Sequence, residues 1–97
     1  MVSVGTEKWK CMASLDRQLE AKAEKIKAFI EEECESRDIE IEEIVTTASY
    51  PYGEVSVFLE NSSSYNLGRI NAFVKSKWPD IESEAPRNYL IEFHFTL

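Results

Sequence analysis

Regularly spaced apolar residues predict two helices in this chain. The first is expected to begin at Ser14, because serine is a good N-cap and the following Asp16 places a negative charge where the helix dipole favours it. An apolar face then recurs at spacings of three and four residues, the pattern of an amphipathic helix about six turns long. Its members are Leu15, Leu19, Ala23, Ile26, Ile30 and Cys34.

The second helix is expected between a serine run and a proline. The polar stretch Asn61–Ser64 interrupts an apolar segment and supplies a cap, whereas Pro79 ends the helix because proline cannot continue the hydrogen-bond ladder. The apolar residues between them share one face, and they are Leu67, Ile70, Phe73, Val74 and Trp78.

Residues 39–60 predict a β-hairpin. The segment 39–49 is rich in Ile, Val and Thr, but its alternation changes phase at Glu43, where we expect a bulge. Val55, Val57 and Leu59 alternate with polar or outward residues in a second strand. The turn Tyr50–Gly53 has proline second and glycine fourth, as in a type I turn, and an aromatic residue before proline also favours a cis peptide bond.

The clearest alternation of the chain is its last, from Tyr89 to Leu97, and it predicts a strand docked in the sheet. Residues 80–88 are expected to be a polar connection. Residues 1–13 have a weak pattern: they are either an irregular lead-in or, over residues 2–11, a short first strand.

These elements predict a single α+β domain over residues 1–97, a two-layer sandwich with two helices on one face of a mainly antiparallel sheet. The order is α-β-β-α-β, or the ferredoxin-like β-α-β-β-α-β if residues 2–11 form a strand. In either order at least one strand edge is open. An edge as apolar as that of the last strand would pair with a second copy, so a homodimer is a further hypothesis.

Charge changes this picture, because all the net charge lies in thirteen residues. Residues 31–43 hold eight carboxylates and one arginine, whereas the rest of the chain has ten acidic and ten basic residues. Several of the carboxylates fall in the last turns of the first helix, where the dipole prefers cations. The run therefore predicts a docking surface for a basic protein and argues against direct nucleic-acid binding. A solvated face and a calcium or magnesium site are the alternatives.

The residues that we expect to contact this partner are acidic, with one tyrosine at the hairpin turn as an apolar anchor. They are Glu31, Glu32, Glu35, Asp38, Glu40, Glu42, Glu43 and Tyr52.

Little else suggests chemistry. His94 is the single histidine and shares the outer face of the last strand with Glu92, which would suit a general base, although a histidine packed at the surface is the simpler interpretation. Cys11 and Cys34 form no Cys-x-x-Cys pair, and we expect free, mostly buried thiols. We expect no catalytic residues, no metal site and no cofactor, and hence no enzyme.

No signal-peptide pattern and no membrane-spanning apolar run is present in the sequence, so we expect a cytoplasmic protein without membrane contact. The layout resembles ferredoxin-like regulatory modules and the cytosolic domains of cation-diffusion transporters. The size and acidity resemble small phage- or plasmid-encoded inhibitors and toxin-immunity proteins. The first hypothesis is thus a small acidic binding module, of inhibitor or immunity type, that docks on a nucleic-acid-binding surface of a partner. The alternative is a ferredoxin-like regulatory domain that binds a small molecule or metal, as a homodimer.

Overall fold

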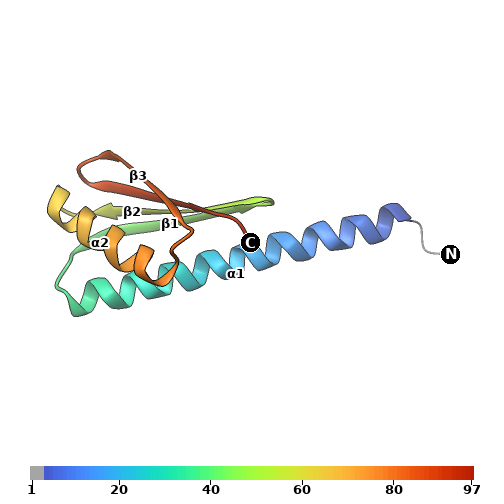
Figure 1. Cartoon of the computed structure of the whole chain (residues 1–97), viewed down its shortest axis with the longest axis horizontal. Helices are drawn as coiled ribbons and strands as arrows, with labels where there is room; N and C mark the ends of the chain where they lie inside the picture. Colours follow the sequence, from blue (N-terminus) through green and yellow to red (C-terminus); the bar gives the residue numbers. More distant parts are fainter. Residues whose placement is uncertain (1–3) are drawn as a thin grey trace.

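The computed structural model describes the backbone of residues 4–97 and the side chains of residues 14–97. Its elements are α1 (Val4–Ser36), β1 (Ile41–Ser49), β2 (Tyr52–Leu59), α2 (Ser64–Lys77), β3 (Glu82–Arg87) and β4 (Leu90–Phe95). The strands form one antiparallel sheet in the order β1-β2-β4-β3. Both helices cover the same face of this sheet (Figure 1), which confirms the predicted two-layer α+β sandwich.

The core lies between this face and the helices. Alternate residues of the two central strands point into it, including Val55 and Val57 of β2 and Ile91 and Phe93 of β4. The predicted apolar faces of both helices cover them, and Phe29 joins the helices through edge-to-face contacts. Its ring centroid lies 5.8 Å from that of Phe73 and 5.2 Å from that of Trp78. The buried residues of the helices are Leu19, Ala23, Ile26, Ile30, Cys34, Leu67, Ile70, Phe73 and Val74.

The prediction for the amino-terminal segment was wrong. Helix α1 begins at Val4, so Ser14 lies inside it, and residues 4–11 are helical rather than extended; residues 1–3 lie outside the described backbone. A capping residue starts a helix only where the preceding chain leaves the helical conformation, and residues 6–13 contain neither glycine nor proline to make it do so. The ferredoxin-like order, which needed a strand over residues 2–11, is therefore also wrong.

Strand β3 was missed, because its sequence Glu-Ser-Glu-Ala-Pro-Arg has almost no residue that favours strands. The strand lies at an edge, where proline is tolerated, and Pro86 falls within the irregularity that separates the Glu84 and Arg87 pairings. Ser83 points toward the helices and its hydroxyl lies 2.7 Å from the Asn71 side-chain oxygen on α2. Tertiary contacts thus hold a segment that local preference would leave irregular.

The β1–β2 hairpin matches its prediction in two of three details. The register shifts between Ile41 and Glu43, which confirms the bulge. The Tyr50–Pro51 peptide bond is cis, as the aromatic–proline pair suggested. The type I turn was wrong: Ser49 pairs with Tyr52, so the connection is Tyr50–Pro51 alone, with the cis proline at the third position of the turn.

Strand β4 is central, and this corrects the prediction that its apolar edge is open. It pairs with β2 on one side and with β3 on the other, so the open edges of the described sheet belong to β1 and β3. The last strand therefore offers no edge to a second copy, and a homodimer through an open strand edge stays a prediction that would have to use β1 or β3. Over the described residues, neither helix has a stretch apolar and long enough to cross a membrane.

Candidate protein-binding groove

The acidic run lies where α1 ends and β1 begins. The Ile39 N–H donates to the Cys34 carbonyl at 2.9 Å, and the Asp38 N–H donates to the Glu35 carbonyl at 3.4 Å. This is the Schellman arrangement, in which the residue after the helix cap is left-handed. Asp38 has that conformation, with a φ of 55°. The chain reverses there, so β1 runs back beside α1 (Figure 1).

The reversal brings four of the eight carboxylates around one pocket of about 250 Å³. Glu31 and Glu35 lie one turn apart on α1, and Glu42 and Glu43 lie opposite them at the bulge of β1. The rest of the lining is apolar or a thiol, contributed by Cys34, Ile39, Ile41 and Ile44. The pocket therefore has acidic walls and an apolar floor.

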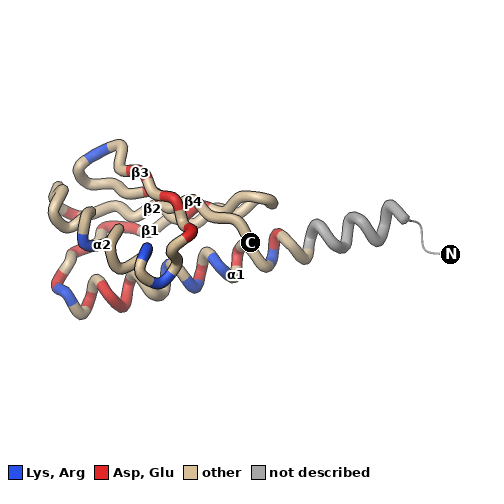
Figure 2. The backbone as a smooth tube through the Cα atoms, in the orientation of Figure 1, with Lys and Arg blue, Asp and Glu red and all other residues tan. Residues whose placement is uncertain are grey.

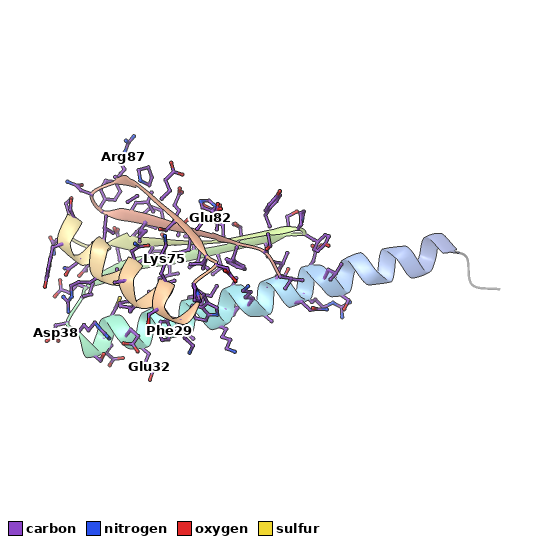
Figure 3. The ribbon with its side chains drawn as sticks, in the orientation of Figure 1. Phe29, Glu32, Asp38, Lys75, Glu82 and Arg87 are labelled. Atoms are coloured by element: carbon purple, nitrogen blue, oxygen red, sulfur yellow. The ribbon has the colours of Figure 1, made fainter. Side chains whose placement is uncertain are left out.

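The other carboxylates of the run lie outside this pocket. Glu33 forms an ion pair with Arg37, the one ion pair among the side chains of residues 14–97. Glu32 points away from the sheet and Asp38 lies at the tip of the turn (Figure 3). Glu40 is exposed in the segment before β1. Residues 31–43 therefore form a smaller common face than the charge count predicted.

Helix α1 and strand β1 also enclose a separate depression nearer the hairpin. A second pocket of about 290 Å³ is lined by Glu20 and Glu24 of α1 and by residues 46–48 of β1. It ends where the Tyr50 backbone N–H donates to Asp16 Oδ1 at 2.8 Å. We call this surface the α1–β1 groove. Its acidic residues are Asp16, Glu20, Glu24, Glu31, Glu35, Glu42 and Glu43.

Sequence reasoning missed the first three of these carboxylates, Asp16, Glu20 and Glu24. In a sum of net charge along the sequence, the negative charges of these three residues are cancelled by Arg17, Lys22 and neighbouring lysines. Acidic and basic residues alternate along this part of α1 (Figure 2). A helix has 3.6 residues per turn, so sorting the charges by helix face would have placed all three beside Glu31 and Glu35. The same flank holds two bases, Arg17 and Lys27.

Tyr52 belongs to the far end of the groove. It is 69% exposed at the hairpin, whereas the bulge with Glu42 lies at the other end of β1. Tyr50 follows Glu42 by eight positions, a separation of roughly 26 Å in an extended chain. Tyr52 could therefore contact a partner that follows the whole groove, but not one confined to the acidic junction.

The groove also runs along a free sheet edge. Strand β1 is the first strand of the sheet, and no described segment pairs with its outer side. Half of the backbone N–H and C=O groups of an edge strand point away from the sheet and can pair with another chain.

Cys34 lies under the groove and is 1% exposed, with a free thiol as expected; the Cys11 side chain lies outside the described residues. Burial raises the pKa of the Cys34 thiol to about 11, and the nearby Arg69 guanidinium only partly opposes this. A protonated, enclosed thiol packs as a small apolar group rather than as a nucleophile.

His94 and Glu92 share the outer face of β4, as their alternation predicted, and both are half-buried. This face is opposite the helices and remote from the floor of the groove. Comparison of the chain with protein-family models, curated proteins and solved structures gave no match.

Proposed function

We propose that this protein is a binding module that holds a basic, extended segment of a partner protein in the α1–β1 groove. One observation carries the proposal: carboxylates line both walls of the apolar-floored pocket at the α1–β1 junction and the helix side of the second pocket, and both pockets lie beside an open strand edge. Each of these three properties recognises a different part of the same ligand.

The charges provide attraction and orientation. Among the described side chains, no lysine or arginine forms an ion pair with the groove carboxylates, and Glu33, which does have a partner, lies outside the groove. A cleft lined by one sign of charge concentrates field lines and raises the rate of encounter with oppositely charged partners. Lysine or arginine side chains are therefore the preferred contacts.

The strand edge provides register. An extended segment that pairs with β1 would add a strand to the sheet, and its main chain would supply most of the hydrogen bonds. Alternate side chains of an added strand point to opposite faces, so every second residue would face α1. Basic residues at those positions would meet the helix wall, and apolar residues could reach the floor at Ile41 and Ile44.

A narrower form of the proposal concerns the partner. Proteins that bind nucleic acid expose basic segments, so occupation of such a segment by this groove would block it. This is the inhibitor or immunity-type role that the acidity of the chain suggests. The surface proposed to contact the partner is now the α1–β1 groove instead of all the carboxylates of residues 31–43.

Synthetic peptides test the proposal directly. We expect a peptide of alternating lysine and valine to bind in a fluorescence-anisotropy titration, with affinity that falls as salt rises. A glutamate–valine peptide should not bind. The double variant Glu35→Lys/Glu42→Lys should weaken binding of the basic peptide at least tenfold with an unchanged melting curve.

The matched control is Glu82→Lys/Glu84→Lys, which changes the net charge equally but lies on the opposite edge strand, β3. It should bind the basic peptide with nearly the affinity of the parent chain. Equal loss of binding in both double variants would mean that only net charge attracts the peptide, and no loss in either would remove the groove as the binding surface.

A further inference from the structure

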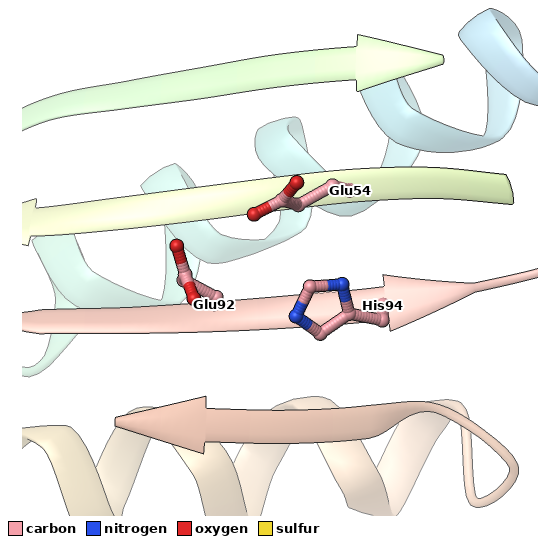
Figure 4. Close-up of side chains that lie close together, drawn as sticks. All are labelled: Glu54, Glu92 and His94. Atoms are coloured by element: carbon pink, nitrogen blue, oxygen red, sulfur yellow. The ribbon is translucent and has the colours of Figure 1, made fainter. Parts of the chain in front are cut away.

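The outer face of the sheet brings together three side chains that commonly ligate metals. Neighbours of Glu54 on β2 and of Glu92 and His94 on β4 point into the core, so these three point outward. Their ligand atoms all lie within 4.8 Å of one another, and all three residues are half-buried (Figure 4). We call them the outer-face cluster.

The sheet register places two more carboxylates beside this cluster. His94 lies directly between Glu54 on β2 and Glu82 on β3, and Glu92 lies directly opposite Glu84. Like charges opposite each other on antiparallel strands destabilise the pair. No lysine or arginine among residues 14–97 forms an ion pair with any of these groups.

We propose that Glu54, Glu92 and His94 bind a divalent transition-metal ion. One imidazole nitrogen with two carboxylates is a donor set that suits zinc, manganese or iron, whereas calcium and magnesium prefer oxygen ligands alone. Three protein ligands leave the remaining coordination positions to water or to a donor group from another molecule.

The separations suit this role. Ligand atoms about 2.1 Å from a tetrahedral metal lie roughly 3.4 Å apart. The cluster is wider than this by an amount that rotation of the two glutamate side chains can close, because its ligand atoms already lie within 4.8 Å. The backbones of β2 and β4 are fixed by their direct pairing, so only side chains need to move.

Two neighbours can orient the ligands. The Ser56 hydroxyl donates to Glu54 Oε1 at 3.3 Å, which restrains that carboxylate. Glu82 lies opposite His94, where its carboxylate can accept the N–H of the imidazole nitrogen that does not face the metal. Partners of this kind fix the histidine tautomer in metal sites. A bound cation would also relieve the repulsion between Glu84 and Glu92.

Zinc titration of the untagged 97-residue chain tests the site, with Cys11→Ser in every sample to remove that thiol as an alternative zinc ligand. We expect one zinc ion per chain by calorimetry and a raised melting temperature, because a ligand that binds only the folded state stabilises it. His94→Ala and Glu92→Gln should each weaken zinc binding at least tenfold. The matched control Glu42→Gln/Glu43→Gln, in the groove, should leave it unchanged.

The single histidine supplies a readout that does not depend on stability. The imidazole signals in NMR should shift on addition of zinc and should not shift with magnesium. Unmoved imidazole signals, or equal zinc affinity in His94→Ala and the parent chain, would overturn the proposal. The groove variants leave the cluster intact, so this result is independent of the peptide experiment.

Discussion

The α1–β1 groove and the outer-face cluster are both acidic, but the chain assembles them in different ways. Most of the groove charge comes from residues 31–43, which one turn folds into two facing walls. The cluster and its neighbours come from β2, β3 and β4, which the register of the sheet aligns. Charge that is dense along the chain is visible in the sequence, whereas charge that is dense only across strands is not.

The two regions also differ in what opposes their charge. In the groove, the carboxylates near the end of α1 face the unfavourable end of the helix dipole, and they are well exposed to water. In the cluster, half-buried ligands lie beside directly opposed carboxylates. Exposed carboxylates suit the binding of a large basic partner, and such binding weakens as the salt concentration rises. Converging half-buried carboxylates suit the binding of a small cation.

The variant with the largest expected effect disturbs the outer-face cluster without replacing any of its three proposed ligands. In Gly53→Ala the new Cβ would overlap the Phe95 ring, and the Gly53–Phe95 pair lies next to the Glu54–His94 pair in the β2–β4 register. We expect a loss of about 1–3 kcal/mol in urea unfolding, the usual result of overpacking. Zinc affinity should fall as well, whereas peptide binding in the groove should persist.

Gly68→Ala is the control for this variant, because nothing lies within 4 Å of its added Cβ on α2. It should stabilise the helix by about 0.5–1 kcal/mol. Undiminished zinc affinity in Gly53→Ala would show that the cluster does not depend on the β2–β4 register.

The next largest expected effect is a change in the free energy of unfolding with pH, and it comes from Cys34 under the groove. The pKa of the Cys34 thiol rises from 9.0 in the unfolded reference to about 11 in the folded chain. Between these values the unfolded chain loses the proton and the folded chain keeps it, so the free energy of unfolding falls as pH rises. We expect a fall of about 2 kcal/mol from this group.

The measurement is urea unfolding between pH 8 and 11 for the parent chain and for Cys34→Ala. The variant should be less stable at neutral pH, because a buried group is truncated, but its stability should depend less on pH. Parallel profiles for the two chains would show that Cys34 ionises alike in both states.

The smallest effects come from neutralising one charge in each region. Asp38→Asn removes a negative charge beside the end of α1 and keeps a residue that tolerates the left-handed backbone, so a gain of a few tenths of a kcal/mol is expected. Glu84→Gln removes the repulsion with Glu92 and should gain about 0.2–1 kcal/mol without metal. Thermal unfolding in a chelator checks both, and destabilisation in either would show that its carboxylate makes a favourable contact.

Local signals predicted most of the helices and the hairpin. Ser63 caps α2 through its hydroxyl, which accepts from the Asn66 N–H at 3.0 Å, and the helix ends before Pro79. The apolar faces, the bulge and the cis bond were also visible, because each depends on residues close together in the chain. The acidic run was visible for the same reason.

The tertiary structure decided the rest. A cap signal at Ser14 did not begin α1, since nothing before it interrupts the helix, and β3 formed from residues with little strand preference because it pairs with β4. The sequence by itself determined which residues face the core and where net charge is concentrated. Only the pairing order β1-β2-β4-β3 decided which edge is open and which carboxylates meet His94. That order depends on contacts between distant segments, which no local pattern encodes.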